Sequence, residues 1–478
     1  MKTTIAAILA LGLIASPAKS QSLTPALDAY MQARESLGGF SGSILVAKDG
    51  KILLSKGYGF ASFELAVPNK ADTKFRAASI TKQFTAMAIL QLRDAGKLRL
   101  DDPLCKFIDD CPDAWKPVTL IQIIHHESGI PDYEEALGLG SERYAAFFDS
   151  ASSTQRILID ARTKPLDFPP GSKFNYSNTG YIILAAVIEK VSGMPYASYI
   201  ETHLLEPAGM TNSLISNSTS FIRGAAYGYT GREDTPLDSL VAGIPFLKGT
   251  AIPVANTDMS GSHGDGALVT TVGDLMKWNQ ALAGAKIISR GSIPEFFKPT
   301  FPATDTVKED GYAFGWIIST HFDQPYDYHT GLLPGFASRI ERYPDSGLFI
   351  IAMTNFDAVR LSRITRDLAA AALGKPYDVP RSHRIVTLDS ASVKKVVGQY
   401  RLTTGVIASV SIGDKYVELK VPDRFTAGLL PESATIFYAP FFEGTVKFTE
   451  DAAGNVTALT MHYNGTDRVA TRVAAAPH

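Results

Sequence analysis

The chain has 478 residues, of which 45% are hydrophobic and 20% are charged, and its formal net charge at pH 7 is −2. This composition is typical of soluble globular proteins, and the length predicts more than one domain because single hydrophobic cores stop growing near about 250–300 residues. The near-neutral charge gives no electrostatic reason to expect nucleic acid binding, and beyond the N-terminal segment no apolar run is long enough to span a bilayer.

The N-terminal segment differs from the rest of the chain. It begins with Met1-Lys2, a short basic start, is almost entirely apolar from Ile5 to Ala15, and ends in small residues just before Gln21. This pattern predicts a secretory signal peptide over residues 1–20, with cleavage before Gln21. We therefore expect a periplasmic or secreted protein, and a bacterial source.

The first half of the chain predicts a helix, a hairpin and a second helix. Residues 24–37 have helical spacing, and Gly42–Gly59 holds two apolar runs joined by Asp49-Gly50, a strong hairpin turn signal. The stretch that begins at Phe75 continues into a long helix that Gly96 ends after Ala95.

Helices dominate the middle of the chain, and strands return late. The clearest middle helix is Thr179–Gly193, and residues 230–262 read as a long loop over a cleft. Tyr328–Asn355 alternates between apolar and polar residues, turns at Pro344-Asp345-Ser346-Gly347 and alternates again, before a helix over Leu361–Leu373. Strands that flank a helical insertion predict an α/β (α+β) domain over residues 21–374, with an antiparallel sheet and a helical subdomain.

The C-terminal part has a different character. Residues 375–385 read as a linker, and residues 386–478 hold short alternating strands joined by Gly-Asp, Gly-Asn and Asn-Gly turns. This pattern predicts a second, all-β domain, either a barrel or a sandwich.

The chain has two cysteines, Cys105 and Cys111. An oxidising compartment permits a disulfide that closes the short loop between them, and two buried free thiols are the alternative. Neither their spacing nor a nearby histidine fits a metal site. The triplet His125-His126-Glu127 also lacks the spacing of a metal-binding helix.

Ser79-Ile80-Thr81-Lys82 is a candidate catalytic pair at the start of the long helix. The pattern alone is weak, because Ser-x-x-Lys recurs at Ser16–Lys19 and at Ser392–Lys395. A serine in the first turn of a helix can share its own N–H with an oxyanion, and three residues place Lys82 on the same face.

The helix beyond Lys82 is apolar on nearly all sides, which predicts a buried lysine. Burial disfavours the charged form of an amine, and a neutral Lys82 can accept the proton of Ser79. The alternative is that Ser79 caps the helix while the Lys82 side chain extends to water.

Two further motifs favour the catalytic interpretation. Tyr176-Ser177-Asn178 supplies a phenol that can carry a proton to a leaving group and an amide that can orient a substrate. His329-Thr330-Gly331 lies on a late strand, where an extended substrate could lie along the strand edge with an N–H facing the oxyanion. A glycine at position 331 would let the substrate approach closely.

These three motifs resemble those of the penicillin-recognising serine hydrolases, which include class C β-lactamases, D,D-peptidases, D-aminopeptidases and related esterases. The stretches "FPPGSKFNYSNTGY", "GDGALVTTVGDLMKW" and "HTGLLPGFASRIERYPDSG" are similar to further landmarks of that family. The resemblance covers about Gly42 to Leu373.

The resemblance implies a role for each matched residue. Ser79 is expected to be acylated, Lys82 and Tyr176 to share the general base and acid work, and Asn178 to contact the substrate amide. The N–H groups of Ser79 and Leu332 are expected to form the oxyanion hole. His329 and Thr330 are expected to face the carboxylate end of the substrate or to line the cleft. No metal and no cofactor is expected.

One residue departs from the class C β-lactamases, which carry lysine where this chain has His329. Histidine there resembles the Streptomyces-type D-alanyl-D-alanine carboxypeptidase and the D-aminopeptidases, and a neutral imidazole binds a carboxylate less firmly than an ammonium does. The C-terminal domain resembles the lipocalin-like domains appended to some members, where such modules cover the active-site entrance or support assembly.

Taken together, the sequence predicts a secreted serine hydrolase that forms an acyl-enzyme with a small peptide, amide or ester, most like a D-specific peptidase of the D,D-carboxypeptidase or D-aminopeptidase type. A class C-like β-lactamase, a carboxylesterase and a penicillin-binding sensor without turnover are the alternatives. The oligomeric state is left open.

Overall fold

A computed structural model describes residues 23–138, 154–217, 221–231, 251–254, 258–300, 310–413 and 416–473. The predicted signal peptide lies outside the described residues, as does most of the predicted loop over residues 230–262. The described ends of that loop, β7 (Tyr229–Gly231) and β8 (Ala251–Pro253), pair as a two-stranded antiparallel sheet.

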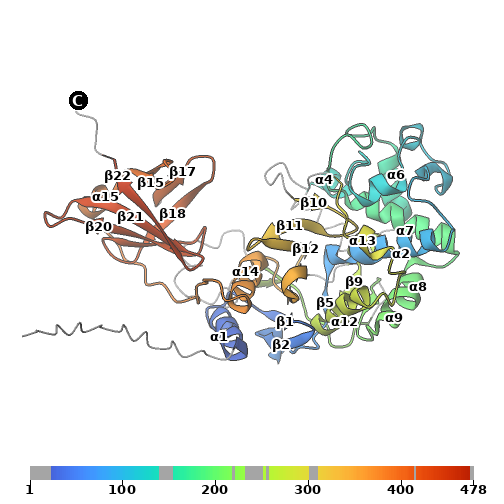
Figure 1. The fold of residues 1–478 in the computed structure, drawn as a ribbon, viewed down its shortest axis with the longest axis horizontal. Coiled ribbons are helices and arrows are strands. Elements are labelled where there is room, and N and C mark those ends of the chain that lie inside the picture. Colours follow the sequence, from blue (N-terminus) through green and yellow to red (C-terminus); the bar gives the residue numbers. More distant parts are fainter. Residues whose placement is uncertain are drawn as a thin grey trace, which may run out of the picture.

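A seven-stranded sheet forms the centre of the first domain, with the strand order β10-β11-β12-β13-β14-β1-β2 (Figure 1). Every neighbouring pair is antiparallel, which confirms the predicted sheet type. The N-terminal hairpin joins the late strands because β1 pairs with β14, with Gly42 opposite Thr354. The strands are β1 (Gly42–Lys48), β2 (Lys51–Tyr58), β10 (Gly311–Tyr312), β11 (Ile317–His321), β12 (Gln324–Leu333), β13 (Phe336–Tyr343) and β14 (Leu348–Thr354).

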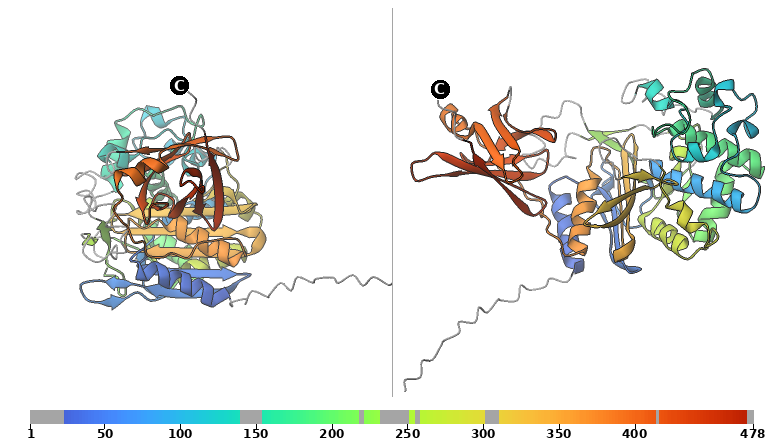
Figure 2. Two further views of the ribbon diagram at one scale, coloured as in Figure 1. Left: turned by 90° about the vertical axis from the view of Figure 1, so that its left-hand side faces the viewer. Right: turned by 45° about the horizontal axis from the view of Figure 1, so that its top comes forward.

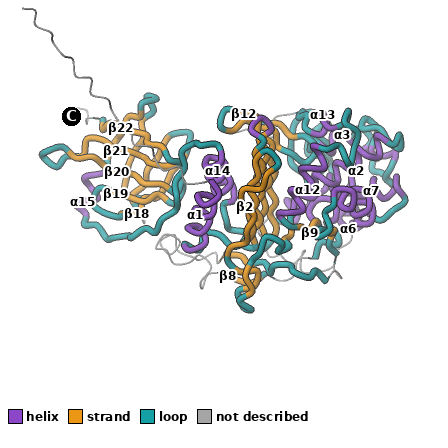
Figure 3. The backbone as a smooth tube through the Cα atoms, turned by 60° about the horizontal axis from the view of Figure 1, so that its bottom comes forward, coloured by secondary structure: helices purple, strands orange, loops and turns teal. Residues whose placement is uncertain are grey.

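Helices cover both faces of this sheet, so all seven residues of the interior strand β14 are buried. On one face lie α1 (Leu23–Ser36) and α14 (Leu361–Ala372), whose apolar side chains share a core with β1, β2 and β14. On the other face lie α2 (Thr81–Asp94), α12 (Val272–Ala283) and the helical subdomain (Figure 3).

The helical subdomain is built from short helices around α7 (Asn178–Ser192), which ends at Gly193 in the left-handed conformation that favours glycine. The other short elements of the first domain are η1 (Ala78–Ile80), η2 (Leu104–Lys106), η3 (Asp113–Trp115), α3 (Leu120–Ile124), α4 (Tyr133–Leu137), α6 (Thr154–Arg162), α8 (Tyr196–Ile200), η4 (Glu201–Leu205), α9 (Glu206–Ala208), α11 (His263–Gly266), α13 (Ile293–Phe296), η5 (Pro344–Ser346), β3 (Phe60–Ser62), β4 (Val67–Pro68), β5 (Phe75–Arg76), β6 (Leu214–Ile215) and β9 (Leu268–Thr270).

Cys105 and Cys111 form a disulfide in the structure, with their Cα atoms 5.3 Å apart. The disulfide decides between the two alternatives that the sequence left open. The bond closes the short loop that follows η2.

The C-terminal part is a closed eight-stranded barrel, which decides between the predicted barrel and sandwich. Each strand pairs antiparallel with the next, and β22 returns to β15, where Arg472 lies opposite Tyr400. A short helix, α15 (Ser390–Val396), precedes the first strand. The strands are β15 (Gly398–Leu402), β16 (Ile407–Ile412), β17 (Val417–Val421), β18 (Phe425–Pro431), β19 (Ile436–Ala439), β20 (Gly444–Glu450), β21 (Val456–Tyr463) and β22 (Thr466–Arg472).

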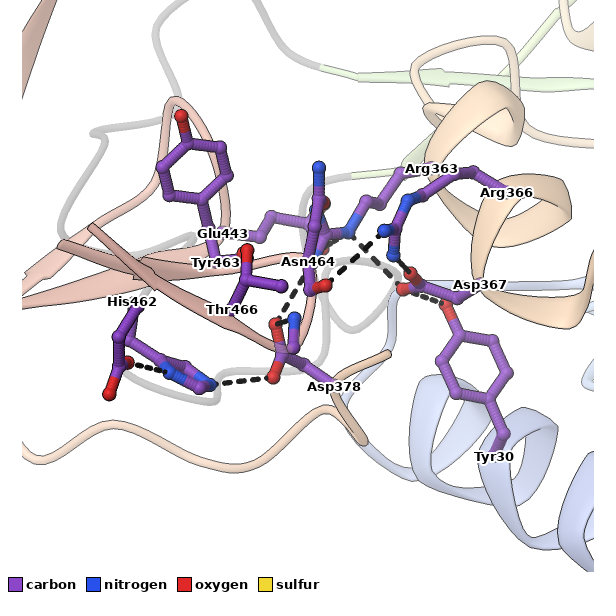
Figure 4. A network of polar contacts seen from close by, with 12 residues as sticks. Tyr30, Arg363, Arg366, Asp367, Asp378, Glu443, His462, Tyr463, Asn464 and Thr466 are labelled. Atoms are coloured by element: carbon purple, nitrogen blue, oxygen red, sulfur yellow. Dashed lines mark hydrogen bonds and ion pairs between the residues drawn. The ribbon is translucent and has the colours of Figure 1, made fainter. Parts of the chain in front are cut away.

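The barrel lies against α1 and α14, on the side of the sheet away from the helical subdomain (Figure 2). Arg363 and Arg366 on α14 donate hydrogen bonds to Asn464 of the barrel. Arg34 on α1 forms an ion pair with Glu443, with 2.7 Å between Nη1 and Oε2. Arg363, Arg366 and Arg34 also surround the fully buried Asp367, to which the Tyr30 hydroxyl donates (Figure 4). A polar network therefore holds the barrel against α1 and α14.

Among the described residues, no helix is both long and apolar enough to cross a lipid bilayer.

Candidate active site

Ser79 lies in a sharp turn between β5 and α2. Ala78, just before it, has a φ of +50°, a conformation that costs an L-residue about 1–2 kcal/mol. The turn is held against the sheet because the Ser338 hydroxyl on β13 donates a hydrogen bond to the Ala77 carbonyl over 2.7 Å. Ser79 itself stays partly exposed, so its hydroxyl is accessible at the junction of sheet and helices.

Lys82 lies one turn further along and is fully buried, as predicted. Its Nζ is 3.0 Å from Ser79 Oγ, 2.7 Å from Asn178 Oδ1 and 3.0 Å from the backbone oxygen of Asp265. Asn178 Oδ1 and the Asp265 carbonyl can only accept hydrogen bonds. A neutral amine therefore gives its two N–H groups to them and directs its lone pair at Ser79.

Burial lowers the pKa of Lys82 below its usual value. The negative charges of Asp265, Glu134 and Asp132 act in the opposite direction and raise the pKa. The net direction is downward, which increases the fraction of neutral amine at a given pH.

Tyr176 lies beside both catalytic candidates. The centre of its ring is 4.9 Å from Lys82 Nζ, and its hydroxyl interacts with the Ser79 side chain. Burial raises the pKa of Tyr176 well above its usual value, although the Ser79 hydrogen bond opposes this shift. The phenol therefore keeps its proton at neutral pH and is suited to donate it.

The Tyr176-Ser177-Asn178 motif is fixed by groups from a neighbouring loop. His126 Nδ1 accepts a hydrogen bond from the Ser177 N–H over 3.0 Å, and its ring lies 4.2 Å from that of Tyr176. The Asp132 carboxylate accepts from the Asn178 N–H. Both contacts hold the first turn of α7, so that Asn178 Oδ1 reaches Lys82.

The third motif lies on the part of β12 that has a free edge. β11 pairs with β12 only as far as Tyr328, and from His329 to Leu333 the described residues pair β12 with β13 alone. Thr330 is exposed and Leu332 is 64% exposed. This stretch contacts the turn that carries Ser79, so its free edge lies beside the nucleophile.

Gly331 has a packing role that the sequence did not predict. A Cβ at this position would lie 2.2 Å from the Ala77 carbonyl oxygen and 2.4 Å from Ser338 Oγ. These atoms belong to the protein itself, so glycine is required here for the close packing of β12 on the Ser79 turn.

His329 is 2% exposed, and both of its ring nitrogens are engaged. Nδ1 donates to the Thr330 carbonyl over 2.7 Å, so Nε2 accepts from the Tyr312 hydroxyl over 3.1 Å. Burial, with the nearby Lys82 charge as a second cause, lowers the pKa of His329 to about 3. The ring is therefore neutral and has no nitrogen free for a substrate carboxylate, whereas Thr330 is accessible.

The buried His329 makes stability depend on pH. Its folded pKa of about 3 lies below the value near 6.5 of an unfolded histidine. The unfolded state therefore binds the proton first, and stability is lost as the pH falls below about 6.5. Between about pH 7.5 and pH 5.5, the wild-type protein should lose about 1.4 kcal/mol more stability than the His329→Asn variant.

Denaturant unfolding of both proteins at the two pH values measures this difference. Other titrating groups cancel in the comparison, so equal losses in the two proteins would show that His329 is protonated without cost in the fold.

The predicted residues Ser79, Lys82, Tyr176 and Asn178 are thus brought together in contact, with β12 beside them. Sequence reasoning missed Asp132, Asp265 and Tyr312, and it gave His126 no contact with the site. Asp265 lies in a stretch that resembles the family, "GDGALVTTVGDLMKW". The sequence offered no spacing rule that ties any of them to Lys82, His329 or Tyr176.

No cluster of three or more histidine, cysteine or acidic side chains with the arrangement of a metal site is found in the described part of the chain.

The chain is similar to several known proteins. Residues 26–374 match a family model described as Beta-lactamase. The chain is 30% identical to penicillin-binding protein 4* of Bacillus subtilis (strain 168), over 91% of this chain and 95% of that protein. It is 26% identical to a D-aminopeptidase of Gluconobacter oxydans (strain 621H), over 76% of this chain and 65% of that protein. The octameric penicillin-binding protein homologue of Pyrococcus abyssi superposes with a TM-score of 0.64 at 24% identity, over 94% of this chain and 99% of that one.

Proposed function

The chain belongs to the beta-lactamase family of serine hydrolases, and from this premise we propose that it is a secreted, D-specific peptidase or amidase that works through an acyl-enzyme on Ser79. The observation that carries the proposal is the contact of a buried lysine amine with both Ser79 Oγ and Asn178 Oδ1. In the proposed organisation residues 21–374 are the catalytic domain, residues 375–385 a linker and residues 386–478 the barrel domain.

In the first step, Ser79 Oγ attacks the carbonyl carbon of the substrate while Lys82 Nζ takes the hydroxyl proton. The opposite pKa directions of the two groups support this assignment, because the amine is made easier to deprotonate and the Tyr176 phenol harder. The N–H groups of Ser79 and Leu332 would bind the resulting oxyanion.

In the second step, the tetrahedral intermediate collapses and the bond to the leaving amine breaks. Tyr176 gives its proton to the leaving nitrogen, and the Lys82 ammonium returns one proton to the phenol. Water then attacks the ester carbonyl by the same route in reverse order, releasing the acid and restoring Ser79. Each turnover consumes one water molecule, and Ser79, Lys82 and Tyr176 end with the protons they had at the start.

The free edge of β12 supports an extended, peptide-like substrate, whose backbone can pair with the strand beyond His329. The buried His329 offers no positive charge to a terminal carboxylate, which favours an aminopeptidase or amidase type over a D,D-carboxypeptidase. The similarity to a D-aminopeptidase agrees with this preference.

Secretion is part of the proposal. The predicted signal peptide supports it, and the disulfide between Cys105 and Cys111 is of the kind that persists in oxidising compartments.

A penicillin-binding protein that acylates slowly or without turnover is the second candidate, favoured by the 30% identity to penicillin-binding protein 4*. A β-lactamase and a carboxylesterase would use the same acylation step and differ in the rate of deacylation.

A substrate panel separates these functions. Purified protein is incubated with D- and L-alanine p-nitroanilide, D-alanyl-D-alanine peptides, a nitrophenyl ester and a fluorescent penicillin. We expect hydrolysis of the D-anilide to be at least about 100-fold faster than hydrolysis of the L-anilide, because the two enantiomers would make different contacts in the cleft. Equal rates for the two anilides would contradict D-specificity, fast penicillin hydrolysis would indicate a β-lactamase, and a stable penicillin adduct without turnover of any substrate would indicate the sensor.

A further inference from the structure

Asp265 is a buried acid at the base of the site, to which the catalytic steps above assign no role. It is the third residue of α11 and is 4% exposed. Its carboxyl group accepts hydrogen bonds from the Tyr133 hydroxyl (3.4 Å, at Oδ2), from the Ser262 side chain and from its own backbone N–H, whereas Oδ1 is buried with no hydrogen-bond partner among the described residues. A buried carboxyl oxygen without a donor costs free energy unless a nearby positive charge compensates it.

Lys82 supplies such a charge when its amine is protonated. The Asp265 backbone oxygen accepts a hydrogen bond from Lys82 Nζ over 3.0 Å, so the amine and this residue are in direct contact. Burial lowers the pKa of Lys82, and Asp265 is the strongest of the charges that oppose this, ahead of Glu134 and Asp132. Burial raises the pKa of Asp265 to about 7, and Lys82 is the strongest influence that lowers it.

The other titratable groups around the amine carry no compensating charge at neutral pH. The rings of Tyr176 and Tyr181 lie 4.9 and 5.6 Å from Lys82 Nζ, and burial raises the pKa of both phenols. Burial lowers the pKa of His126 and His329, and the Lys82 charge is the next cause in each case. The three acids are therefore the charges that can stabilise an ammonium here, and Asp265 is the one whose backbone oxygen contacts the amine.

We propose that Asp265 is the positioning residue for the lysine base: its carbonyl orients the Lys82 lone pair toward Ser79, and its carboxylate stabilises the ammonium that forms when Lys82 takes the serine proton. The inference rests on the proposed function, because the proton comes from Ser79 during acylation. The step balances within the pair: the O–H bond of Ser79 breaks, an N–H bond of Lys82 forms, and the Asp265 carboxylate compensates the new positive charge.

The Asp265→Asn variant tests the proposal, since it keeps the backbone carbonyl and nearly the same side-chain shape but removes the charge. The full chain is labelled with [13Cε]lysine, and the Lys82 resonance is identified as the one missing from Lys82→Met. We expect the pKa of Lys82 to fall by about one pH unit or more in Asp265→Asn, because a nearby opposite charge typically raises the pKa of a cation by that much. The matched control is Asp274→Asn, which removes another buried aspartate, 1% exposed, that pairs with Lys277. It should leave the pKa of Lys82 unchanged.

A kinetic readout accompanies the titration. With a substrate of the panel, the acidic limb of the kcat/KM profile of Asp265→Asn should move to lower pH by the same amount, while the plateau falls about 10- to 100-fold because the ammonium is less stabilised. A residue that only supports the fold would lower the plateau without moving the limb.

An unchanged pKa of Lys82 in folded Asp265→Asn would overturn the inference, whatever the activity. A lowered pKa in a protein that hydrolyses no substrate of the panel would leave the pairing established and count against the proposed function instead. If Asp265→Asn does not fold, Asp265→Ala is titrated in its place with the same expectation.

Discussion

The Ser79→Ala variant is expected to lose hydrolysis of every substrate by a factor of about 10⁴ or more, because it removes the atom that forms the acyl-enzyme. Labelling by a fluorescent penicillin should disappear in the same variant. The fold should persist, since Ser79 is partly exposed and alanine keeps its Cβ. The measurements are kcat/KM, adduct formation by mass spectrometry and the thermal midpoint.

The chain offers a matched control for this variant. Ser392 and Lys395 repeat the Ser-x-x-Lys spacing on the short helix α15, beside the barrel and remote in the fold from β12. Ser392→Ala should leave the rates unchanged. Hydrolysis or labelling that persists in Ser79→Ala would contradict the assignment of the nucleophile.

The Lys82→Met variant is expected to lower kcat/KM by about 10²- to 10⁴-fold, the range for loss of a general base. Methionine has an unbranched side chain of similar length but cannot accept the serine proton. The wild-type rate should rise with pH as Lys82 loses its proton, with the midpoint below the usual pKa of lysine because burial lowers the pKa of this amine. In Lys82→Met that limb of the pH profile should be absent.

Two controls accompany the Lys82→Met measurement. Lys395→Met, on α15, should retain wild-type rates, and circular dichroism should show whether removal of the buried cation leaves the fold intact. A Lys82→Met protein that is folded and keeps more than about a tenth of the activity would show that another group, with Tyr176 as the first candidate, takes the serine proton.

Local patterns predicted much of the fold. The hairpin over β1 and β2 follows from Asp49-Gly50, where both residues have positive φ, and the end of α7 follows from Gly193 in the left-handed conformation. The alternation beyond residue 386 predicted the strands of the barrel. It left barrel and sandwich open, because closure depends on β22 returning to β15 across the whole domain.

The candidate site divides in the same way. Ser79 and Lys82 are three residues apart at a helix start, so their contact is local and the sequence alone predicts it. Lys82 meets Asn178 across 96 residues and the Asp265 carbonyl across 183, and only the packing of α7 and α11 against α2 brings them together.

The sequence by itself determined which residue types this protein brings to the candidate site: a serine and a lysine on one helical turn, a tyrosine and an asparagine before a helix, and a glycine in a strand. Only the tertiary structure decided that His329 is buried with both nitrogens engaged, that Gly331 makes room for the Ser79 turn, and that the Asp265 backbone oxygen contacts the lysine. The physical reason is that exposure, hydrogen-bond partners and pKa are set by neighbours from distant segments, which no spacing along the chain encodes.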